Sequence, residues 1–330
     1  MHPTTSETPY ANLEPDLILD AVESLSLQCD GRLLALNSYE NRVYQVGIED
    51  AAPLVVKFYR PGRWSDEAIL EEHQFSQELV EEELSVVAPM AFDGVTLHHF
   101  KDHRFTLFPR QGGHAPELAH QPSLRHLGQV LARLHNVGSW QGFEHRPRLS
   151  TKLYGHEARA FIMQGQWLPP HMETVFADLT EHLLNEIDSA WERAGGIKRL
   201  RVHGDCHPGN ILWREETAHF VDLDDSLMAP AMQDLWMLLA GERHEMQEQL
   251  LWILDGYQLF RDFDATELHL LEALRALRLL HYNAWLARRW NDPAFPRTFP
   301  WFDSPRHWET LTNQLREQIA AIQEPTLSVI

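Results

Sequence analysis

The sequence predicts an α+β fold with two lobes, in which a small antiparallel sheet carrying one long helix precedes a larger, mainly helical lobe. Two observations predict this fold. Strand-like apolar runs separated by polar turns are concentrated in the first third of the chain, around one amphipathic helix. After Gln111-Gly112-Gly113 the pattern changes to long helical segments with short strand-like runs between them. A chain of 330 residues is long enough for two lobes with separate cores.

The first lobe, residues 1–107, is predicted to contain an N-terminal helix, a five-stranded sheet and one further helix. The N-terminal helix follows Pro15, and Ser65 is the expected N-cap of the second helix. Turns at Asp93-Gly94 and Lys101-Asp102 divide the last part of the lobe into strands. In chain order, the predicted elements are a helix at 16–28, strands at 32–36, 42–48 and 53–59, a helix at 64–83, and strands within 86–110.

The second lobe is predicted at residues 114–330, after a hinge at 108–113. Residues 123–138 have a helical pattern that places three leucines on one face. Short strand-like runs interrupt the later helices at 200–203, 211–213 and 219–223. We expect the catalytic and metal-binding loops to lie beside these runs, since ligands usually bind in the cleft between lobes.

Composition excludes several classes of function. The formal net charge of -20 argues against a nucleic-acid or anionic-membrane partner, because like charges repel. Cys29 and Cys206 are the only cysteines, so a disulfide framework is excluded and the reducing cytoplasm is the expected setting. The N-terminal segment has acidic residues and no apolar core, which argues against a secretory signal. No uninterrupted apolar run is long enough to span a bilayer.

The stretch RVHGDCHPGNILW, residues 201–213, contains the densest cluster of chemically active side chains. Asp205 and Asn210 are five positions apart, the spacing of the acid and the amide in a phosphoryl-transfer catalytic loop. Asp222 follows Asn210 by twelve positions, after a second strand-like run. A hairpin of these two runs would bring the Asn210 amide and the Asp222 carboxylate together, and Mg²⁺ prefers such oxygen ligands. The pattern predicts phosphoryl transfer, with Asp205 accepting the proton of the attacking hydroxyl.

The same stretch has alternative interpretations. His203 and His207 flank Asp205, and a His-x-Asp-x-His array can hold zinc for hydrolysis. The structural alternative, which we favour for His203, is a packed histidine that orients the loop. Cys206 is interpreted as a small semi-buried thiol without activation. Asp224 and Asp225 are either solvated loop charges or, for Asp224, an outer metal ligand.

Lys57 stands within an otherwise apolar strand-like run and is one of only four lysines in the chain. A buried ammonium group needs a partner, because an unpaired buried charge is strongly unfavourable. A phosphate-binding lysine braced by a helix glutamate fits this pattern. Glu72 is the expected brace, since it shares a helix face with apolar residues, and Glu71 is the alternative. A lysine at a sheet edge whose ammonium reaches water is the structural alternative.

The segment NSYENR, residues 37–42, lies between the first two strands, where a kinase carries its glycine-rich phosphate cover. It contains no glycine, and a G-x-x-x-x-G-K-[ST] loop is absent from the whole chain. Such a turn can still direct backbone N–H groups and the Ser38 hydroxyl at a phosphate. An ordinary hairpin turn is the alternative.

These residues, in the order Lys57, Glu72, Asp205, Asn210 and Asp222, resemble the aminoglycoside-phosphotransferase and choline-kinase-like branch of the protein-kinase-like superfamily. Within that branch, the chain is similar to the bacterial stress response kinase A group over roughly residues 14–325. The segments that carry the resemblance include NSYENRVYQV, VVKFYRPGRW, ILEEHQF, LGQVLARLHNVG, HGDCHPGNILW, FVDLDD, QDLWMLL and NDPAFPRTFPWF.

The resemblance implies a bilobal protein-kinase-like fold and a cytoplasmic, monomeric serine/threonine protein kinase of the stress response. ATP would be its co-substrate, Mg²⁺ its metal and a protein hydroxyl its acceptor. Asp205 would accept the proton, and Asn210 and Asp222 would bind magnesium. Ser38 would contact phosphate, and Asp234 would fix the catalytic loop. Adenine is expected to bind the hinge backbone near Phe108 and Arg110.

The catalytic loop departs from that of ordinary protein kinases in one respect. Gly204 stands where their H-R-D motif has the arginine that pairs with an activation-loop phosphate. Asp222 and Asp234 are only twelve residues apart, too close for a long regulatory segment. We therefore predict a site that needs no activation-loop phosphorylation. Three alternatives stay open: a kinase of choline, homoserine or a sugar, a metallohydrolase, and an inactive nucleotide-binding scaffold.

Overall fold

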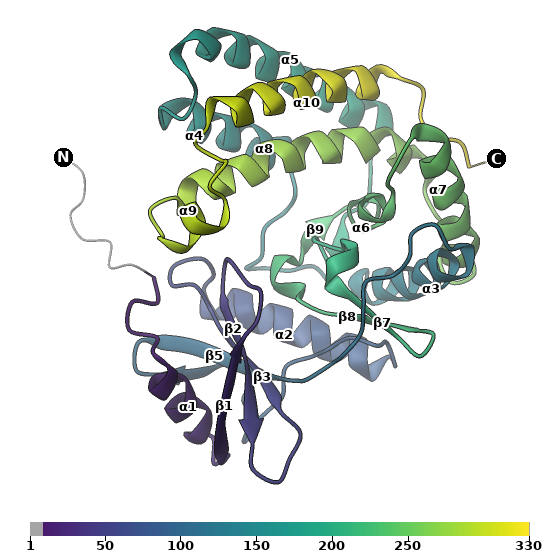
Figure 1. Ribbon diagram of the computed structural model, residues 1–330. Coiled ribbons are helices and arrows are strands. Elements are labelled where there is room, and N and C mark those ends of the chain that lie inside the picture. The colour runs from purple at the N-terminus through teal and green to yellow at the C-terminus, as the bar shows by residue number, and fades with distance from the viewer. Residues whose placement is uncertain (1–8, 330) are drawn as a thin grey trace. The chain divides into compact units, whose positions relative to one another are not determined.

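The computed structural model describes residues 9–329, which form two compact units (Figure 1). Among the described residues, the first unit combines those up to Pro116 with Phe143–Arg146 and Pro208–Ser226. The second combines Glu117–Gly142, Pro147–His207 and the described residues from Leu227 onward. Each unit is discontinuous in the chain, whereas the lobes at 1–107 and 114–330 were predicted as continuous segments. Those bounds, and the hinge at 108–113, stay a prediction.

A five-stranded antiparallel sheet with the order β1-β2-β3-β5-β4 forms the centre of the first unit. Helix α1 packs on one face, where Ile18, Ala21 and Val22 join Val56 and Phe58 in a buried apolar cluster. The elements of this part are α1 (Pro15–Glu23), β1 (Cys29–Ala35), β2 (Arg42–Ile48), β3 (Leu54–Phe58), α2 (Asp66–Glu81), β4 (His98–Phe100) and β5 (His103–Pro109).

Helix α2 begins as the sequence predicts, because the Ser65 hydroxyl accepts a hydrogen bond from the Ala68 N–H at 3.2 Å. Helix α1 is shorter than the predicted 16–28 and ends at Glu23. The Ser24 hydroxyl bonds to the Ala21 carbonyl, and Ser26 has a left-handed φ of 63°, which no helix can continue through.

A separate β-hairpin also belongs to the first unit, although it begins more than a hundred residues after the end of β5. Strands β7 (Ile211–Arg214) and β8 (Thr217–Phe220) pair antiparallel. Their turn has positive φ at both Glu215 and Glu216, the geometry that two-residue hairpin loops require. Single bridges from Val86 to Phe220 and from His114 to Trp213 join the hairpin to the rest of the unit. The short helices η3 (Pro208–Asn210) and η4 (Leu223–Asp225) flank the hairpin.

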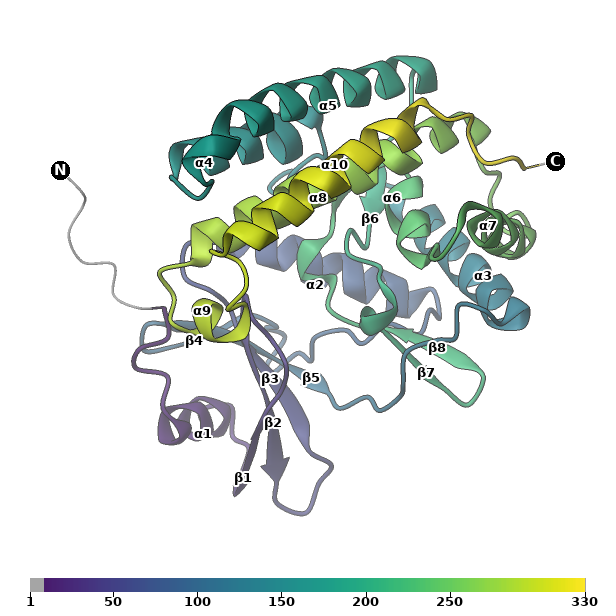
Figure 2. The same cartoon turned by 45° about the horizontal axis from the view of Figure 1, so that its top comes forward.

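The second unit is mainly helical and contains one two-stranded sheet, β6 with β9. Figure 2 shows α10 lying along α8 and α5. Helices α3 and α7 approach closely, since a Cβ at Gly128 would collide with the Ile253 carbonyl. The elements are α3 (Gln121–Gly138), η1 (Lys152–His156), α4 (Glu157–Gln164), η2 (Pro170–Met172), α5 (Glu173–Ala194), β6 (Leu200–Val202), β9 (Leu227–Ala229), α6 (Met232–Leu235), η5 (Trp236–Leu238), α7 (Arg243–Tyr257), η6 (Ala265–Leu270), α8 (Leu271–Arg289), α9 (Ala294–Thr298) and α10 (Pro305–Gln323).

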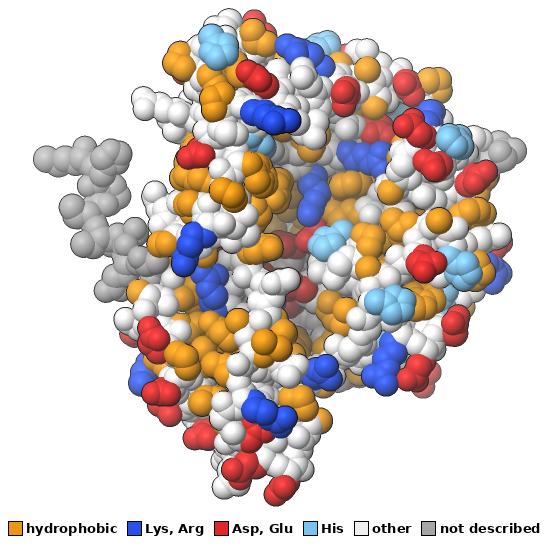
Figure 3. Space-filling model, in the orientation of Figure 1, with side chains coloured by type: hydrophobic (Ala, Val, Ile, Leu, Met, Phe, Trp, Pro, Cys, Tyr) orange, Lys and Arg blue, Asp and Glu red, His pale blue; other side chains and the backbone are white. Residues whose placement is uncertain are grey.

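Acidic residues outnumber basic ones, 48 against 28, which gives the formal net charge of -20. Figure 3 shows acidic side chains spread over the visible face among basic and apolar ones. Among the residues that the structure describes, no helix is both long enough and apolar enough to cross a membrane. The prediction that the N-terminus is not a secretory signal concerns a segment whose first eight residues lie outside the described ones.

Candidate functional site

Lys57 lies near the end of β3, with its side chain on the sheet face opposite the one that α1 covers. Its neighbours Val56 and Phe58 point into the apolar cluster under α1, so strand alternation directs Lys57 to the other face. There the ammonium group meets three carboxylates. Its Nζ lies 3.1 Å from Asp222 Oδ1, 3.2 Å from Asp224 Oδ1 and 3.8 Å from Glu72 Oε1. Lys57 is therefore a buried ion-pair centre, which excludes a lysine whose ammonium reaches water.

The two glutamates considered as the helix brace have different partners. Glu72 is buried and faces Lys57, although at the longest of the three distances. Glu71 faces elsewhere, because its carboxylate accepts hydrogen bonds from the backbone N–H groups of 144, 145 and 146. Burial raises the pKa of Glu72 to about 7, while Lys57 acts in the opposite direction.

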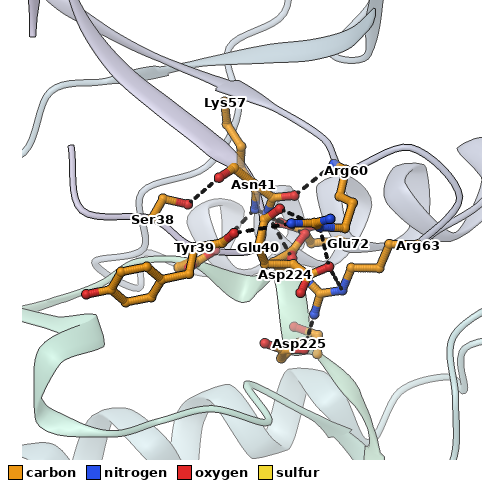
Figure 4. A network of polar contacts seen from close by, with 12 residues as sticks. Ser38, Tyr39, Glu40, Asn41, Lys57, Arg60, Arg63, Glu72, Asp224 and Asp225 are labelled. Atoms are coloured by element: carbon orange, nitrogen blue, oxygen red, sulfur yellow. Dashed lines mark hydrogen bonds and ion pairs between the residues drawn. The ribbon is translucent and has the colours of Figure 1, made fainter. Parts of the chain in front are cut away.

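Asp224 is the most strongly paired carboxylate of the group, and it is buried rather than solvated. Its Oδ2 accepts a hydrogen bond from Asn41 Nδ2 at 3.0 Å and forms an ion pair with Arg63. Burial alone would raise the pKa of Asp224, but Arg63 and Lys57 outweigh it and hold the pKa well below its usual range. Figure 4 shows these side chains converging on Asp224 from three separate segments. Asp225 is half exposed and pairs with Arg63.

The turn at 37–42 is tied to this network by its last residues. Asn41 accepts a hydrogen bond from the Arg60 N–H at 3.1 Å while its amide holds Asp224. Arg60 Nε lies 3.1 Å from Glu40 Oε1 and 3.0 Å from the Glu40 carbonyl oxygen. The Ser38 hydroxyl donates to the Asn41 carbonyl at 3.0 Å and so closes the turn (Figure 4). The turn is fixed by side chains in place of the glycines that it lacks.

The β7–β8 hairpin brings Asn210 and Asp222 together, as the sequence predicts. The N–H of Val221 donates to the Asn210 carbonyl at 3.0 Å, next to Asp222. Asp222 has a left-handed backbone with φ 58° and ψ 64°, which separates it from the regular strand. Its side chain is 55% exposed, against 3% for Asp224. A carboxylate and an amide oxygen are ligands that Mg²⁺ takes while it keeps several waters, so the chemistry of these two residues fits such an ion.

Asp205 lies in the second unit, where Arg278 and His207 flank it. Arg278 Nη2 lies 2.7 Å from Asp205 Oδ1, and His207 Nε2 lies 3.6 Å from Asp205 Oδ2. His203 is fully buried, and its Nδ1 lies 3.4 Å from the Asp205 N–H. Within the described residues, no group of three or more histidine, cysteine or acidic side chains is arranged to hold a metal. The full burial of His203 and its contact with the Asp205 N–H fit a packed histidine that orients the loop.

Asp234 holds the loop that carries Asp205. Its Oδ2 accepts from the His203 N–H at 2.9 Å and its Oδ1 from the Gly204 N–H at 2.8 Å. His135 Nε2 contacts the same carboxylate at 3.1 Å, in a fully buried position. Gly204 has a φ of 85°, which favours glycine at this position. The arginine of an H-R-D motif would be strained here.

Comparison with known proteins identifies the family of this chain. The model of the phosphotransferase enzyme family (APH) matches residues 32–271. The chain belongs to this family. Stress response kinase A of Escherichia coli (strain K12) is 43% identical over 320 residues, 97% of each chain. The serine/threonine protein kinase RdoA of Salmonella typhimurium is 42% identical over the same shares. These matches confirm the predicted resemblance, and the chain is a phosphotransferase enzyme of the kinase type.

Solved structures of other kinases share the fold. The amicoumacin kinase hAmiN, in complex with AMP-PNP and Ca²⁺, has a TM-score of 0.72 at 18% identity and covers 93% of each chain. A microcompartment-associated aminopropanol kinase has a TM-score of 0.70 at 17% identity, covering 93% of this chain and 97% of its own. These likenesses confirm the predicted α+β, kinase-like fold class.

Several residues of this phosphotransferase site have no role that the sequence pattern predicts, among them Asn41, Arg63 and Arg146. For Asp224 the sequence allows either a solvated charge or a metal ligand. The signal available was modest: Arg60 and Arg63 follow the lysine strand directly, and Asn41 ends a turn without glycine. Cys206 is fully buried, and burial raises the pKa of its thiol well above the usual value, so it is not activated.

The two residues predicted at the adenine site lie at the end of β5. Phe108 is opposite Val55 in the β3–β5 pairing, and Arg110 Nε donates to Gln45 Oε1 at 2.8 Å. The side chain of Arg110 is therefore used within the sheet. A role of the backbone at 108–110 in adenine binding stays a prediction.

Proposed function

We propose that this enzyme is a serine/threonine protein kinase that transfers the γ-phosphoryl group of ATP to protein hydroxyl groups with Mg²⁺. The observation that carries the proposal is the buried Lys57 beside Asp222, in the unit that also contains Asn210. A cation for phosphates and oxygen ligands for a metal are the parts that phosphoryl transfer requires. The names of the relatives that are 42–43% identical support the protein acceptor and a place in the stress response.

In this mechanism the first unit binds the nucleotide. Lys57 would bind the α- and β-phosphates, with Glu72 and Asp224 fixing its side chain. Backbone N–H groups of the 37–42 turn and the Ser38 hydroxyl would cover the phosphates, and the backbone at 108–110 would bind adenine. Asn210 and Asp222 would hold Mg²⁺, which, when bound, neutralises charge on the phosphoryl oxygens.

Asp205 would act on the acceptor. The hydroxyl oxygen of the acceptor forms a bond to the γ-phosphorus while the bond from that phosphorus to the β–γ bridging oxygen breaks and ADP leaves. The hydroxyl proton passes to the Asp205 carboxylate. Arg278 and His207 flank this carboxylate and would fix its orientation. Asp234 would hold the loop through the backbone at 203 and 204.

The nature of the acceptor separates this proposal from a small-molecule kinase. The test is transfer from [γ-³²P]ATP with Mg²⁺ to a generic protein acceptor, beside choline, homoserine and sugars. We expect label on serine and threonine of the protein, and no label with Asp205→Ala. If only a metabolite were labelled, the enzyme would be a small-molecule kinase, and the proposed phosphoryl transfer would still hold. Stoichiometric zinc in elemental analysis, with phosphate transfer absent, would favour the hydrolase.

We further propose that the kinase is cytoplasmic and monomeric. Sedimentation of the purified protein tests the monomeric state.

A further inference from the structure

The four residues Phe143–Arg146 belong to the first unit, although in the chain they lie between α3 and η1 of the second unit. We infer that this segment, called the clasp below, locks helix α2 to the 222–226 loop and thereby holds Lys57 and its carboxylates ready for nucleotide. This inference rests on the proposed function and concerns its regulation. The clasp does permanently what activation-loop phosphorylation does in ordinary protein kinases.

Glu71 of α2 makes the first set of contacts with the clasp. Its carboxylate accepts hydrogen bonds from three successive backbone N–H groups, at 2.6 Å from residue 144, 3.0 Å from residue 145 and 3.1 Å from residue 146. Hydrogen bonds to a charged acceptor are about twice as strong as neutral ones. Three such bonds to one side chain fix the segment to α2 at the turn that also carries Glu72.

Arg146, the last residue of the clasp, makes the second set of contacts. It is 4% exposed, and its guanidinium donates in three directions: Nη1 to the Ala68 carbonyl at 2.9 Å, Nε to the Ser226 carbonyl at 2.6 Å, and Nη2 to the Asp224 carbonyl. The first acceptor belongs to α2 and the other two to the loop that follows Asp222. One rigid fork therefore joins the two elements whose carboxylates surround Lys57. A lysine cannot reproduce this geometry.

Aromatic contacts fill the remaining space around the clasp. The Arg146 guanidinium lies 4.7 Å from the centre of the Trp64 ring, within the range of a cation–π interaction. The Phe143 ring packs edge-on against Phe75 of α2, with centroids 5.7 Å apart. Polar and apolar contacts thus act on the same helix, which leaves α2 little freedom to move from the loop.

The consequence concerns regulation. In protein kinases the lysine–glutamate pair and the metal-binding aspartate must both be in place, and phosphorylation of a long segment controls their positions. Here only twelve residues separate Asp222 from Asp234, and Gly204 replaces the phosphate-binding arginine. Arg146 supplies a guanidinium that engages backbone carbonyls and so needs no phosphate. The Lys57–Glu72 pair is therefore held in place by the fold itself.

The first experiment measures nucleotide binding, which needs no acceptor. Glu71→Ala is the main variant, because Glu71 is only partly buried and the fold should persist. We expect its Kd for Mg²⁺–ATP to rise about five- to tenfold. Glu81→Ala removes a charge from the exposed end of the same helix and should leave the Kd within twofold. Amide hydrogen exchange at 144–146 should accelerate in Glu71→Ala and stay slow in Glu81→Ala. Unchanged Kd and exchange in Glu71→Ala would overturn the clasp.

The second experiment separates an effect on the lysine pair from general loosening. In a double-mutant cycle with Glu72→Gln, the effect of Glu71→Ala on the Kd should shrink to less than about twofold, since the pair is already broken. An equal loss in both backgrounds would show a merely structural role. Arg146→Lys should weaken binding at least as much as Glu71→Ala.

Phosphatase treatment tests the regulatory consequence directly. Treated wild-type protein should retain its full rate of transfer, and a rate that disappears until the 222–234 segment is phosphorylated would contradict the inference. Failure of wild-type protein to transfer phosphate to any acceptor would count against the proposed function, whereas the Kd and exchange measurements would still decide on the clasp.

Discussion

The ammonium group of Lys57 lies 3.1 Å from the Asp222 carboxylate, although 165 residues separate the two in the chain. Asp224 is nearly as close, and Glu72 is more distant. Burial alone would lower the pKa of Lys57, but Asp224, Glu72 and Asp222 together raise it well above its usual value. Lys57 is therefore charged at neutral pH, with Asp222 and Asp224 as its nearest partners and Glu72 of α2 as the third.

Replacing Lys57 should weaken both nucleotide binding and folding. Lys57→Met removes the cation that pairs with Glu72 and leaves Asp224 with fewer partners. We expect the Kd for ATP to rise more than tenfold and the free energy of unfolding to fall by about 3 kcal/mol. Calorimetric titration and urea unfolding measure the two effects. Lys101→Met, at the exposed β4–β5 turn, is the control and should change neither quantity.

Asp224 should make the fold sensitive to acid. Its folded-state pKa lies below its ordinary value, so its stabilising contribution is present above the unfolded pKa of about 3.9 and is lost as the pH falls further. Asp224→Asn should be less stable than wild type at pH 7, by about 3 kcal/mol, and the difference should narrow below about pH 4. Urea unfolding over this pH range checks the prediction, and a constant difference would contradict it.

The contribution of Glu267 to stability should change with pH in the direction opposite to that of Asp224. It is buried, its Oε2 accepts the Met232 N–H at 2.7 Å, and burial raises its pKa from 4.5 to about 7. Its stabilising contribution is therefore complete below about pH 4.5 and is lost as the pH rises through about 7. Between about pH 4.5 and pH 7, the free energy of unfolding should fall by about 3 kcal/mol less in Glu267→Gln than in wild type. The glutamine keeps an acceptor oxygen but does not titrate. Parallel losses in the two proteins would count against this account.

Asp234 should affect the catalytic rate more than nucleotide binding. Asp234→Ala leaves the buried N–H groups of His203 and Gly204 without their acceptor, so the loop carrying Asp205 loosens. We expect kcat to fall more than tenfold and the unfolding free energy by about 3 kcal/mol. The KM for ATP should stay within about twofold, because the proposed nucleotide contacts belong to the first unit. Asp234→Asn keeps one acceptor oxygen, so its kcat and its unfolding free energy should lie between those of wild type and Asp234→Ala.

Much of the fold could be predicted because the local signals for caps, turns and strands agree with the pattern of apolar residues that become buried. The Ser65 cap, the turn at Asp93-Gly94 and the alternation around Lys57 each follow from short-range chemistry, and the structure has all three. The end of α1 was predicted too late, since the left-handed conformation at Ser26 depends on how the chain enters β1 and is not a property of serine.

The candidate site could be predicted only in part. Residues 205, 210 and 222 follow a spacing that the chemistry fixes, so one sequence is enough to propose them. The partners of Asp224 and of the clasp residues come from segments 73 to 183 positions away, and no periodicity links them. Glu71 and Glu72 are adjacent on one helix, and only the packing of 143–146 decides which of them faces Lys57.

The central claim is that Asp222 binds the metal and Asp205 accepts the proton in transfer from ATP. Transfer of ³²P from [γ-³²P]ATP to a protein acceptor, measured with Mg²⁺ for wild type, Asp222→Ala and Asp205→Ala, tests it most directly. We predict transfer by wild type that EDTA abolishes and Mg²⁺ restores, and a loss of at least about a thousandfold in each folded variant. Near-normal transfer by either variant would contradict the account.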